Sequence, residues 1–188
     1  MTNKRWSFLL VVFLVGLALA SFAVAAQESR LRLDHLNRLA STATESVEVN
    51  LDQEALRALT KLMVLTERDK TRLENSLSGL SGVYVRGYQF EQEGQYSPND
   101  IETVRSQLNG DWTRIAQVGG RDGSHDEVYL KYGNDEISAY TVISTKPKNI
   151  CVINVVGQMK LDEIGALDRE FGISNCGKWR ERNKSKSR

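Results

Sequence analysis

The stretch WTRIAQVGGRDGSHDEVYLKYGNDEISAYTVISTKPKNICVINVVGQM covers residues 112–159 and decides the fold. It contains four runs of mainly apolar and β-branched residues, a composition typical of strands: Trp112–Val118, Glu127–Tyr132, Glu136–Thr145 and Ile150–Met159. The joins between these runs are rich in glycine, asparagine, aspartate and proline, which are turn residues. A parallel crossover needs a dozen residues or more, so joins this short predict antiparallel pairing.

The chain before residue 112 adds two strands and most of the helices. Val47, Val49 and Leu51 alternate with polar residues, and Val83–Phe90 forms a second strand-like run. Apolar residues at helical spacing predict helices over about 32–44, 53–65, 66–79 and 98–109, and a last one over about 161–171. The order predicts an α+β fold: an antiparallel sheet of about five to six strands with helices packed on one face.

The first 26 residues have the three parts of a secretory signal peptide. Lys4 and Arg5 give a basic start, an apolar run extends from Trp6 to Ala20, and Ala23–Ala25 supplies small residues at the end. The sequence therefore predicts a mature protein outside the cytoplasm.

An uncleaved signal anchor is the alternative interpretation. From Trp6 to Ala26 there are 21 residues without a charge, close to the ~20 that a membrane-spanning helix needs. The small residues at the end favour cleavage, after Ala25 or Ala26, and export to the periplasm or the extracellular space. No cysteine follows the apolar run, which argues against a bacterial lipoprotein.

Charge divides the rest of the chain into a domain and a tail. Residues 27–177, predicted as a single domain, carry 17 Lys and Arg against 23 Asp and Glu, whereas residues 178–188 carry six basic residues and one acid. A short basic tail is usually disordered and solvated. Its alternative role is a weak contact with an anionic membrane, sensitive to salt. The acidic domain lacks basic residues interleaved with aromatic ones, so nucleic acid is a poor candidate partner.

The two cysteines, Cys151 and Cys176, allow one disulfide bond. In an oxidising compartment an even pair often forms a bridge, and this one would connect the last predicted helix to a strand. Two separate thiols are the alternative, with Cys151 as a small buried residue. The cysteines form no C-x-x-C motif, so the sequence predicts neither a redox site nor a zinc site.

No catalytic constellation is present in the sequence. The two histidines, His35 and His125, are expected to be solvated, on a helix and beside a turn. Asp122–Glu127 resembles the start of a calcium loop, but Glu127 stands where the loop needs glycine and Gly133 where it needs glutamate. A hairpin turn is the better interpretation. We therefore predict no catalytic residue, no metal site and no cofactor.

One strand carries a possible contact surface. Tyr84, Tyr88 and Phe90 share one face of the predicted strand because their spacing is even, and Val83 and Val85 take the other. If the valine face is buried in the core, the aromatic face is exposed and can bind a partner. The opposite orientation, with the aromatic residues inward, is equally compatible with the pattern.

The order of elements and three short sequence motifs resemble a known family. The motifs are Ala43–Asp52 (ATESVEVNLD), Trp112–Ile115 (WTRI) and Ile153–Gly157 (INVVG). Together they resemble the bacterial family known as domain of unknown function 4252, over roughly residues 31–171. The resemblance implies a small exported bacterial protein; some members are lipoproteins, but this chain lacks the lipidated cysteine. The family supplies no catalytic residues that could be assigned to this sequence.

The leading functional hypothesis is a non-enzymatic protein of the cell envelope that binds another protein or a small ligand. An envelope enzyme with an unrecognised site is the first alternative, and a deeply buried carboxylate near His35 or His125 would favour it. A regulatory partner of a membrane signalling protein is the second, and there the tail 178–188 would contribute.

Overall fold

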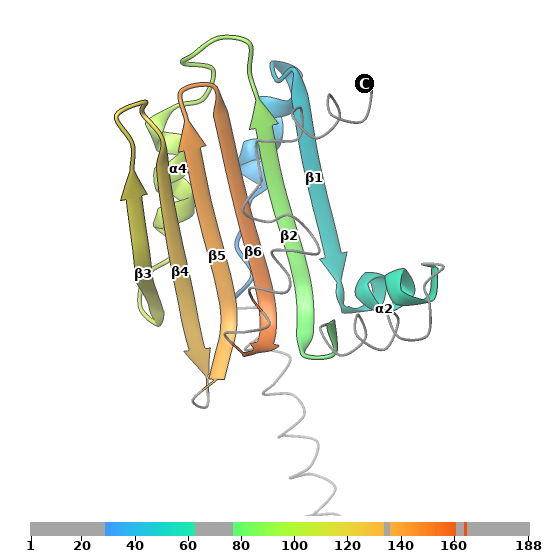
Figure 1. Cartoon of the computed structure of the whole chain (residues 1–188). Coiled ribbons are helices and arrows are strands. Elements are labelled where there is room, and N and C mark those ends of the chain that lie inside the picture. Colours follow the sequence, from blue (N-terminus) through green and yellow to red (C-terminus); the bar gives the residue numbers. More distant parts are fainter. Residues whose placement is uncertain (1–28, 63–76, 134–135, 161–163, 165–188) are drawn as a thin grey trace, which may run out of the picture.

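One six-stranded antiparallel sheet dominates the computed structural model, which describes residues 29–62, 77–133, 136–160 and 164 (Figure 1). The strands are β1 (Glu45–Asp52), β2 (Leu80–Gln89), β3 (Trp112–Gly119), β4 (His125–Gly133), β5 (Glu136–Lys146) and β6 (Asn149–Met159). Their order across the sheet is β1-β2-β6-β5-β4-β3, and all five neighbouring pairs are antiparallel. The predicted α+β class and antiparallel sheet are confirmed, with six strands.

Three helices accompany the sheet in the described part of the chain: η1 (Asp34–Ser41), α2 (Gln53–Leu62) and α4 (Pro98–Arg105). Helix α4 begins where the sequence predicts it, with Pro98 in the first turn and a capping box between Ser97 and Asp100. The backbone N–H of Ser97 donates to Asp100 Oδ2 over 2.7 Å. The first predicted helix is a 3₁₀-helix and starts later than expected, at Asp34.

The helices do not all lie on one face of the sheet. Helices η1 and α4 lie behind it in the view of Figure 1 and contribute Leu36, Leu39 and Val104 to one apolar cluster. Leu56 of α2 belongs to a second cluster, with Cys151 and Ile153 of β6, on the opposite face. The prediction of helices on one face is therefore not confirmed. The physical reason is that β6 is buried on both of its faces, so both need cover.

Several sequence predictions fall outside the described residues. These are the signal peptide over 1–26, the tail over 178–188, Cys176, and most of the helices predicted over 66–79 and 161–171. Within the described ranges, no helix is long and apolar enough to cross a membrane.

Candidate functional site

The segment Ser29–Leu33, which we call the strap, lies across the face of the sheet that η1 and α4 cover. Its side chains alternate: Ser29, Leu31 and Leu33 are buried, whereas Arg30 and Arg32 are exposed. This is the pattern of an extended segment with one face on a core. The strap therefore buries apolar side chains against the sheet and presents two arginines outward.

Asn154, in the middle of β6, fixes the strap to the sheet. Its side chain is fully buried. Its Oδ1 accepts from the N–H of Leu31 over 3.0 Å, and its Nδ2 donates to the carbonyl of Ser29 over 3.2 Å and to Thr141 Oγ1 over 3.1 Å. Gln107, just after α4, makes a second attachment, accepting from the N–H of Arg32 over 2.8 Å and donating to its carbonyl over 3.0 Å.

Replacing Asn154 with leucine is expected to release the strap. The change leaves the buried N–H of Leu31 without its acceptor and removes the bond from Asn154 to the carbonyl of Ser29, at a cost of about 2 kcal/mol of unfolding free energy. The expected signature is faster amide hydrogen exchange at Leu31. Thr141→Val is the matched control, since it removes one side-chain bond and leaves the strap's own bonds intact. Equal protection of Leu31 in both variants would contradict this role of Asn154.

A cavity of about 280 Å³ lies between the strap and the strands β1 and β2. We call it the arginine pocket, because three of its eight lining residues are arginines. The lining residues are Arg30, Leu31, Arg32, Leu33, Asp34, Asn50, Tyr84 and Arg86. Asp34 is the one acid among these residues. The lining therefore carries an excess of positive charge.

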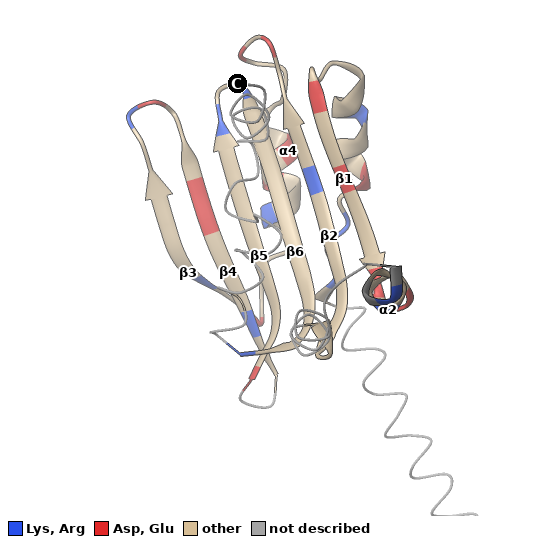
Figure 2. Ribbon diagram, turned by 45° about the vertical axis from the view of Figure 1, so that its right-hand side comes forward, with Lys and Arg blue, Asp and Glu red and all other residues tan. Residues whose placement is uncertain are grey.

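Arg86 supplies a fixed charge at one wall of the pocket. It is only 3% exposed, and Figure 2 shows it as the basic segment within β2. Its Nε donates to Asn37 Oδ1 over 2.8 Å, its Nη1 to the carbonyls of Val85 and Val49, and its Nη2 to Asn50 Oδ1 over 3.1 Å. Its Nη2 also pairs with the carboxylate of Glu48 over 3.0 Å. These partners use all five donors of the guanidinium.

Arg30 and Arg32 differ from Arg86 because their charged groups lie at the surface. The guanidinium carbon of Arg30 stands 4.3 Å from the centre of the Tyr84 ring, a cation–π contact that holds it over the pocket. Among the described residues, neither guanidinium has a hydrogen bond or an ion pair. Both groups can therefore donate to a bound anion.

The proposed contact residues Tyr84, Tyr88 and Phe90 do not form an exposed surface. Tyr88 and Phe90 are each 2% exposed and belong to the core cluster beneath the strap. The aromatic residues therefore point inward, as in the second of the two orientations that the sequence allows, but the valine face is covered as well, because Val83 belongs to the second cluster. Tyr84 is 8% exposed and contributes to the arginine pocket, so one of the three residues remains at a candidate site.

A second polar group, the Glu127 cluster, lies between β4, β3 and α4. The carboxylate of Glu127 is fully buried. Its Oε1 accepts from Arg105 Nε over 2.9 Å and lies 3.3 Å from His125 Nε2. Its Oε2 accepts from the hydroxyl of Tyr129 over 2.6 Å and lies 3.6 Å from Arg114 Nη1. Figure 2 shows the acidic segment of β4 on which this cluster is built.

The Glu127 cluster holds its carboxylate ionised. Burial raises the pKa of Glu127, but hydrogen bonds from Arg105 and Tyr129 and the charge of Arg105 outweigh burial, so the pKa lies below its usual range. Burial and the neighbouring carboxylate raise the pKa of Tyr129. A carboxylate so fully supplied with donors is a weak base, and the arrangement is typical of a structural ion pair.

His35 and His125 are not simply solvated, as the sequence suggested. His35 Nε2 lies 3.1 Å from the backbone oxygen of Asp100, at the start of α4. The side chain of His125 is 33% exposed and contacts Glu127. The contact of His35 was not predictable, because Asp100 lies 65 positions further along the chain, at the start of another helix. His125 contacts Glu127 because β4 begins at His125, which puts the two side chains on the same face of one strand, whereas the sequence placed His125 in or beside the turn before that strand.

Asp122–Glu127 belongs to a hairpin, the preferred interpretation of this segment: Asp122 and Ser124 lie in the turn between β3 and β4, and His125–Glu127 begin β4. Asp122 Oδ1 accepts from the N–H and the hydroxyl of Ser124, over 3.1 and 2.6 Å, and the N–H of Gly120 donates to the carbonyl of Ser124 over 2.9 Å. Among the described residues, no three His, Cys, Asp or Glu side chains lie within reach of one metal ion.

Cys151 lies in β6 and is 1% exposed. Its predicted partner, Cys176, lies outside the described residues, so the disulfide bond between them stays a prediction.

A comparison with known protein families shows which family this chain belongs to. A family model described as a domain of unknown function (DUF4252) matches residues 41–167. The chain belongs to this family. No curated protein and no solved structure matches the chain significantly. The DUF4252 match includes Asn50, Tyr84 and Arg86 but begins after the strap, so the family region supplies one wall of the arginine pocket and residues 30–34 supply the other.

Proposed function

We propose that this protein is a non-enzymatic binding module of the bacterial cell envelope that holds a small anion in the arginine pocket. The observation that carries the proposal is the grouping of two surface guanidinium groups, Arg30 and Arg32, with the buried charge of Arg86 around one cavity. The signal peptide predicted over residues 1–26 supports the envelope location.

The chemistry of the pocket favours a carboxylate or a phosphate. A guanidinium group presents parallel N–H donors that match the oxygens of either anion. The cavity, at about 280 Å³, lies just below the range of roughly 300–1,000 Å³ that is usual for drug-sized ligands. A small organic or inorganic anion therefore fits better than a long chain or a polymer.

An enzyme with an unrecognised site is the alternative that the Glu127 cluster brings forward. A buried carboxylate beside His125 is the arrangement that would favour catalysis. However, the carboxylate is saturated by donors, and its lowered pKa makes it a poor general base. We therefore assign the cluster a structural role and place the binding function at the arginine pocket.

A regulatory partner of a membrane signalling protein is the second alternative. Its sequence basis is the basic tail over residues 178–188, which lies outside the described residues. Anion binding in the arginine pocket is compatible with such a role, because a sensor module also needs a ligand.

Titration calorimetry at low ionic strength tests the proposal, with inorganic phosphate and succinate as probes. We expect saturable binding of at least one anion by the mature protein. The double variant Arg30→Gln/Arg32→Gln is expected to lose at least about tenfold in affinity, since each lost charge-assisted hydrogen bond is worth roughly 1.5 kcal/mol or more.

Two single variants provide a matched comparison: Arg32→Gln changes a pocket residue, and Arg57→Gln is the control outside the pocket. Arg57 is an exposed arginine of α2, so its loss changes the net charge by the same amount without touching the pocket. We expect Arg57→Gln to leave affinity within about twofold. Equal weakening by both changes, or no saturable binding of either probe, would refute the assignment.

A further inference from the structure

The strand β3 is exposed on both of its faces. Every residue from Thr113 to Gly119 is exposed, and only Trp112 at its start is buried. Ile115 is 51% and Val118 63% exposed, and with Tyr132 of β4 they are the exposed large hydrophobic residues of the described chain. All three lie at one end of the sheet, on two adjacent strands (Figure 1).

The two edge strands of the sheet differ in how they discourage pairing. Strand β1 carries three acids, Glu45, Glu48 and Asp52, and no base. Charged residues of one sign on an edge disfavour addition of another strand. Strand β3 carries a single charge, Arg114, among eight residues. The edge at β3 is therefore the better candidate for pairing with another chain.

The side chains of β3 are assigned to the two faces of the sheet in the same order whether the strand is read from its first residue or from its last. We call this symmetry the palindrome of β3. Pairing with β4 places Trp112, Arg114, Gln117 and Gly119 on the strap face, opposite Lys131, Tyr129, Glu127 and His125. It places Thr113, Ala116 and Val118 on the other face, opposite Leu130, Val128 and Asp126. A β-bulge between Arg114 and Ala116 causes the shift in alternation, with Ile115 as the extra residue.

This palindrome makes the strand self-complementary. If two copies of β3 pair antiparallel about a two-fold axis between Ile115 and Ala116, each residue meets one of the same face. Arg114 then faces Gln117 of the second copy, and Thr113 faces Val118 of the second copy. The two bulges coincide, so Ile115 of each copy faces Ala116 of the other. No like charges meet, and the apolar residues continue across the junction.

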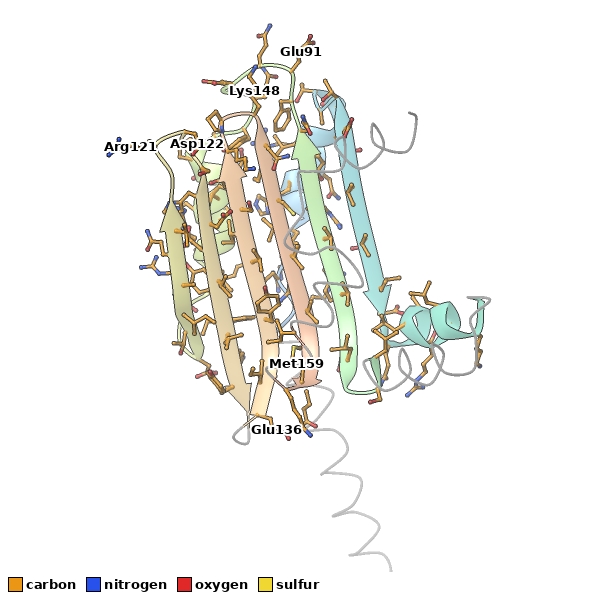
Figure 3. All side chains as sticks on the ribbon, viewed as in Figure 1. Glu91, Arg121, Asp122, Glu136, Lys148 and Met159 are labelled. Atoms are coloured by element: carbon orange, nitrogen blue, oxygen red, sulfur yellow. The ribbon has the colours of Figure 1, made fainter. Side chains whose placement is uncertain are left out.

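The charges beyond the strand ends also complement each other. The same register brings the tip of the β3–β4 hairpin beside the residues that precede β3 in the second copy. Figure 3 shows Arg121 pointing outward from that tip. Asp111, directly before β3, has a side chain that is 78% exposed and only a long contact of 3.7 Å to Lys131. The two-fold axis therefore places two Arg121–Asp111 pairs at the ends of the junction.

We propose that the protein forms a homodimer in which the β3 strands of two copies pair antiparallel about this axis. The result is a continuous twelve-stranded sheet, and the interface is isologous, the commonest kind among soluble oligomers. The proposal is independent of the arginine pocket, which lies at the β1–β2 end of the sheet.

Sedimentation velocity over about 1 to 100 µM tests the proposal. We expect the mass of a dimer at the upper end of this range. Val118→Lys, which places two charges at the junction, is expected to yield a monomer throughout. Ser46→Lys is the matched control, since it adds the same charge to the exposed edge strand β1 and should leave the dimer intact.

A charge-exchange experiment identifies the register. Arg121→Glu and Asp111→Arg are each expected to weaken dimerisation about fivefold, and the double variant to recover most of the loss, because it restores both pairs in reverse. A monomer at all concentrations would overturn the proposal. A dimer that Val118→Lys leaves unchanged would place the interface elsewhere. Additive losses in the double variant would exclude this register.

Discussion

Replacing Gly157 with alanine is expected to cost at least about 3 kcal/mol of unfolding free energy. Gly157 has a φ of 135°, a conformation that side chains disfavour. A Cβ atom at this position would lie 2.3 Å from the carbonyl oxygen of Gly79, 2.5 Å from Leu80 Cα and 2.7 Å from the nitrogen of Ser81. All three are backbone atoms, so no side-chain rotation can relieve the contact. Urea unfolding at neutral pH measures the effect.

Gly94→Ala is the matched control for this prediction. Gly94 also has a positive φ, of 78°, but a Cβ atom there would meet nothing within 4 Å. Its replacement should therefore cost only the conformational penalty, about 1 kcal/mol. The difference between the two variants isolates the close approach of β6 to the start of β2, where the register shifts between Leu80 and Gly82. Equal costs would mean that the strands move apart easily.

The strands of the second half of the chain were predictable because local chemistry decides them. Each join is short and carries turn residues, so pairing between consecutive strands follows from the sequence alone. The positions of β1 and β2 are different. Strand β2 pairs with β6, whose paired residues lie 60 or more positions further along the chain, and no local signal specifies that contact.

The strap was missed because two patterns overlap at its position. Leu33, Leu36 and Leu39 have helical spacing, and this extended the predicted helix back to residue 32. Leu31, Arg32 and Leu33 also alternate, which is the pattern of an extended segment. The structure follows the alternation up to Leu33 and the helical spacing from Asp34. The alternation was the one signal that could have located a wall of the arginine pocket.

The buried polar residues could not be found from sequence. Arg86 and Glu127 each stand in a strand where a charged residue is normally solvated. Their burial depends on partners from other elements: Asn37 of η1 for Arg86, and Arg105 of α4 for Glu127. The amino-acid composition counts these two residues as charges and does not show that their side chains are buried.

The sequence motif INVVG at residues 153–157 supported the family resemblance, and the structure gives a physical reason for several of its residues. Asn154 fixes the strap, and Val155 is fully buried in the second core cluster. Gly157 permits the close approach of β2. The motif therefore joins three parts of the fold at one strand.

Glu127→Gln is the second large effect that we expect, at about 2–3 kcal/mol of unfolding free energy near pH 7. Glutamine is almost the same size but carries no charge. Arg105 would lose its hydrogen-bonded counter-ion, and the hydroxyl of Tyr129 would lose a strong acceptor. Since α4 contacts the sheet through this pair, we expect the helix to lose protection from hydrogen exchange as well.

The effect should depend on pH in one direction. The pKa of Glu127 in the folded protein lies below its ordinary value, so its contribution to stability is fully present above the unfolded-state value of about 4.3. The contribution is lost as the pH falls through the lower, folded-state pKa. The stability of the wild-type protein should therefore fall more steeply below about pH 4.3 than that of Glu127→Gln. The gap between the two proteins should narrow.

Glu102→Gln distinguishes this role from a general effect of charge. Glu102 also pairs with Arg105, over 3.5 Å, but its side chain is 67% exposed. An exposed pair of this kind contributes at most about 0.5 kcal/mol. The two variants change the net charge equally and contact the same arginine, so burial of the carboxylate is the main difference between them. If both cost the same, or if the gap for Glu127→Gln stays constant down to about pH 3, the ionised state of Glu127 does not stabilise the fold.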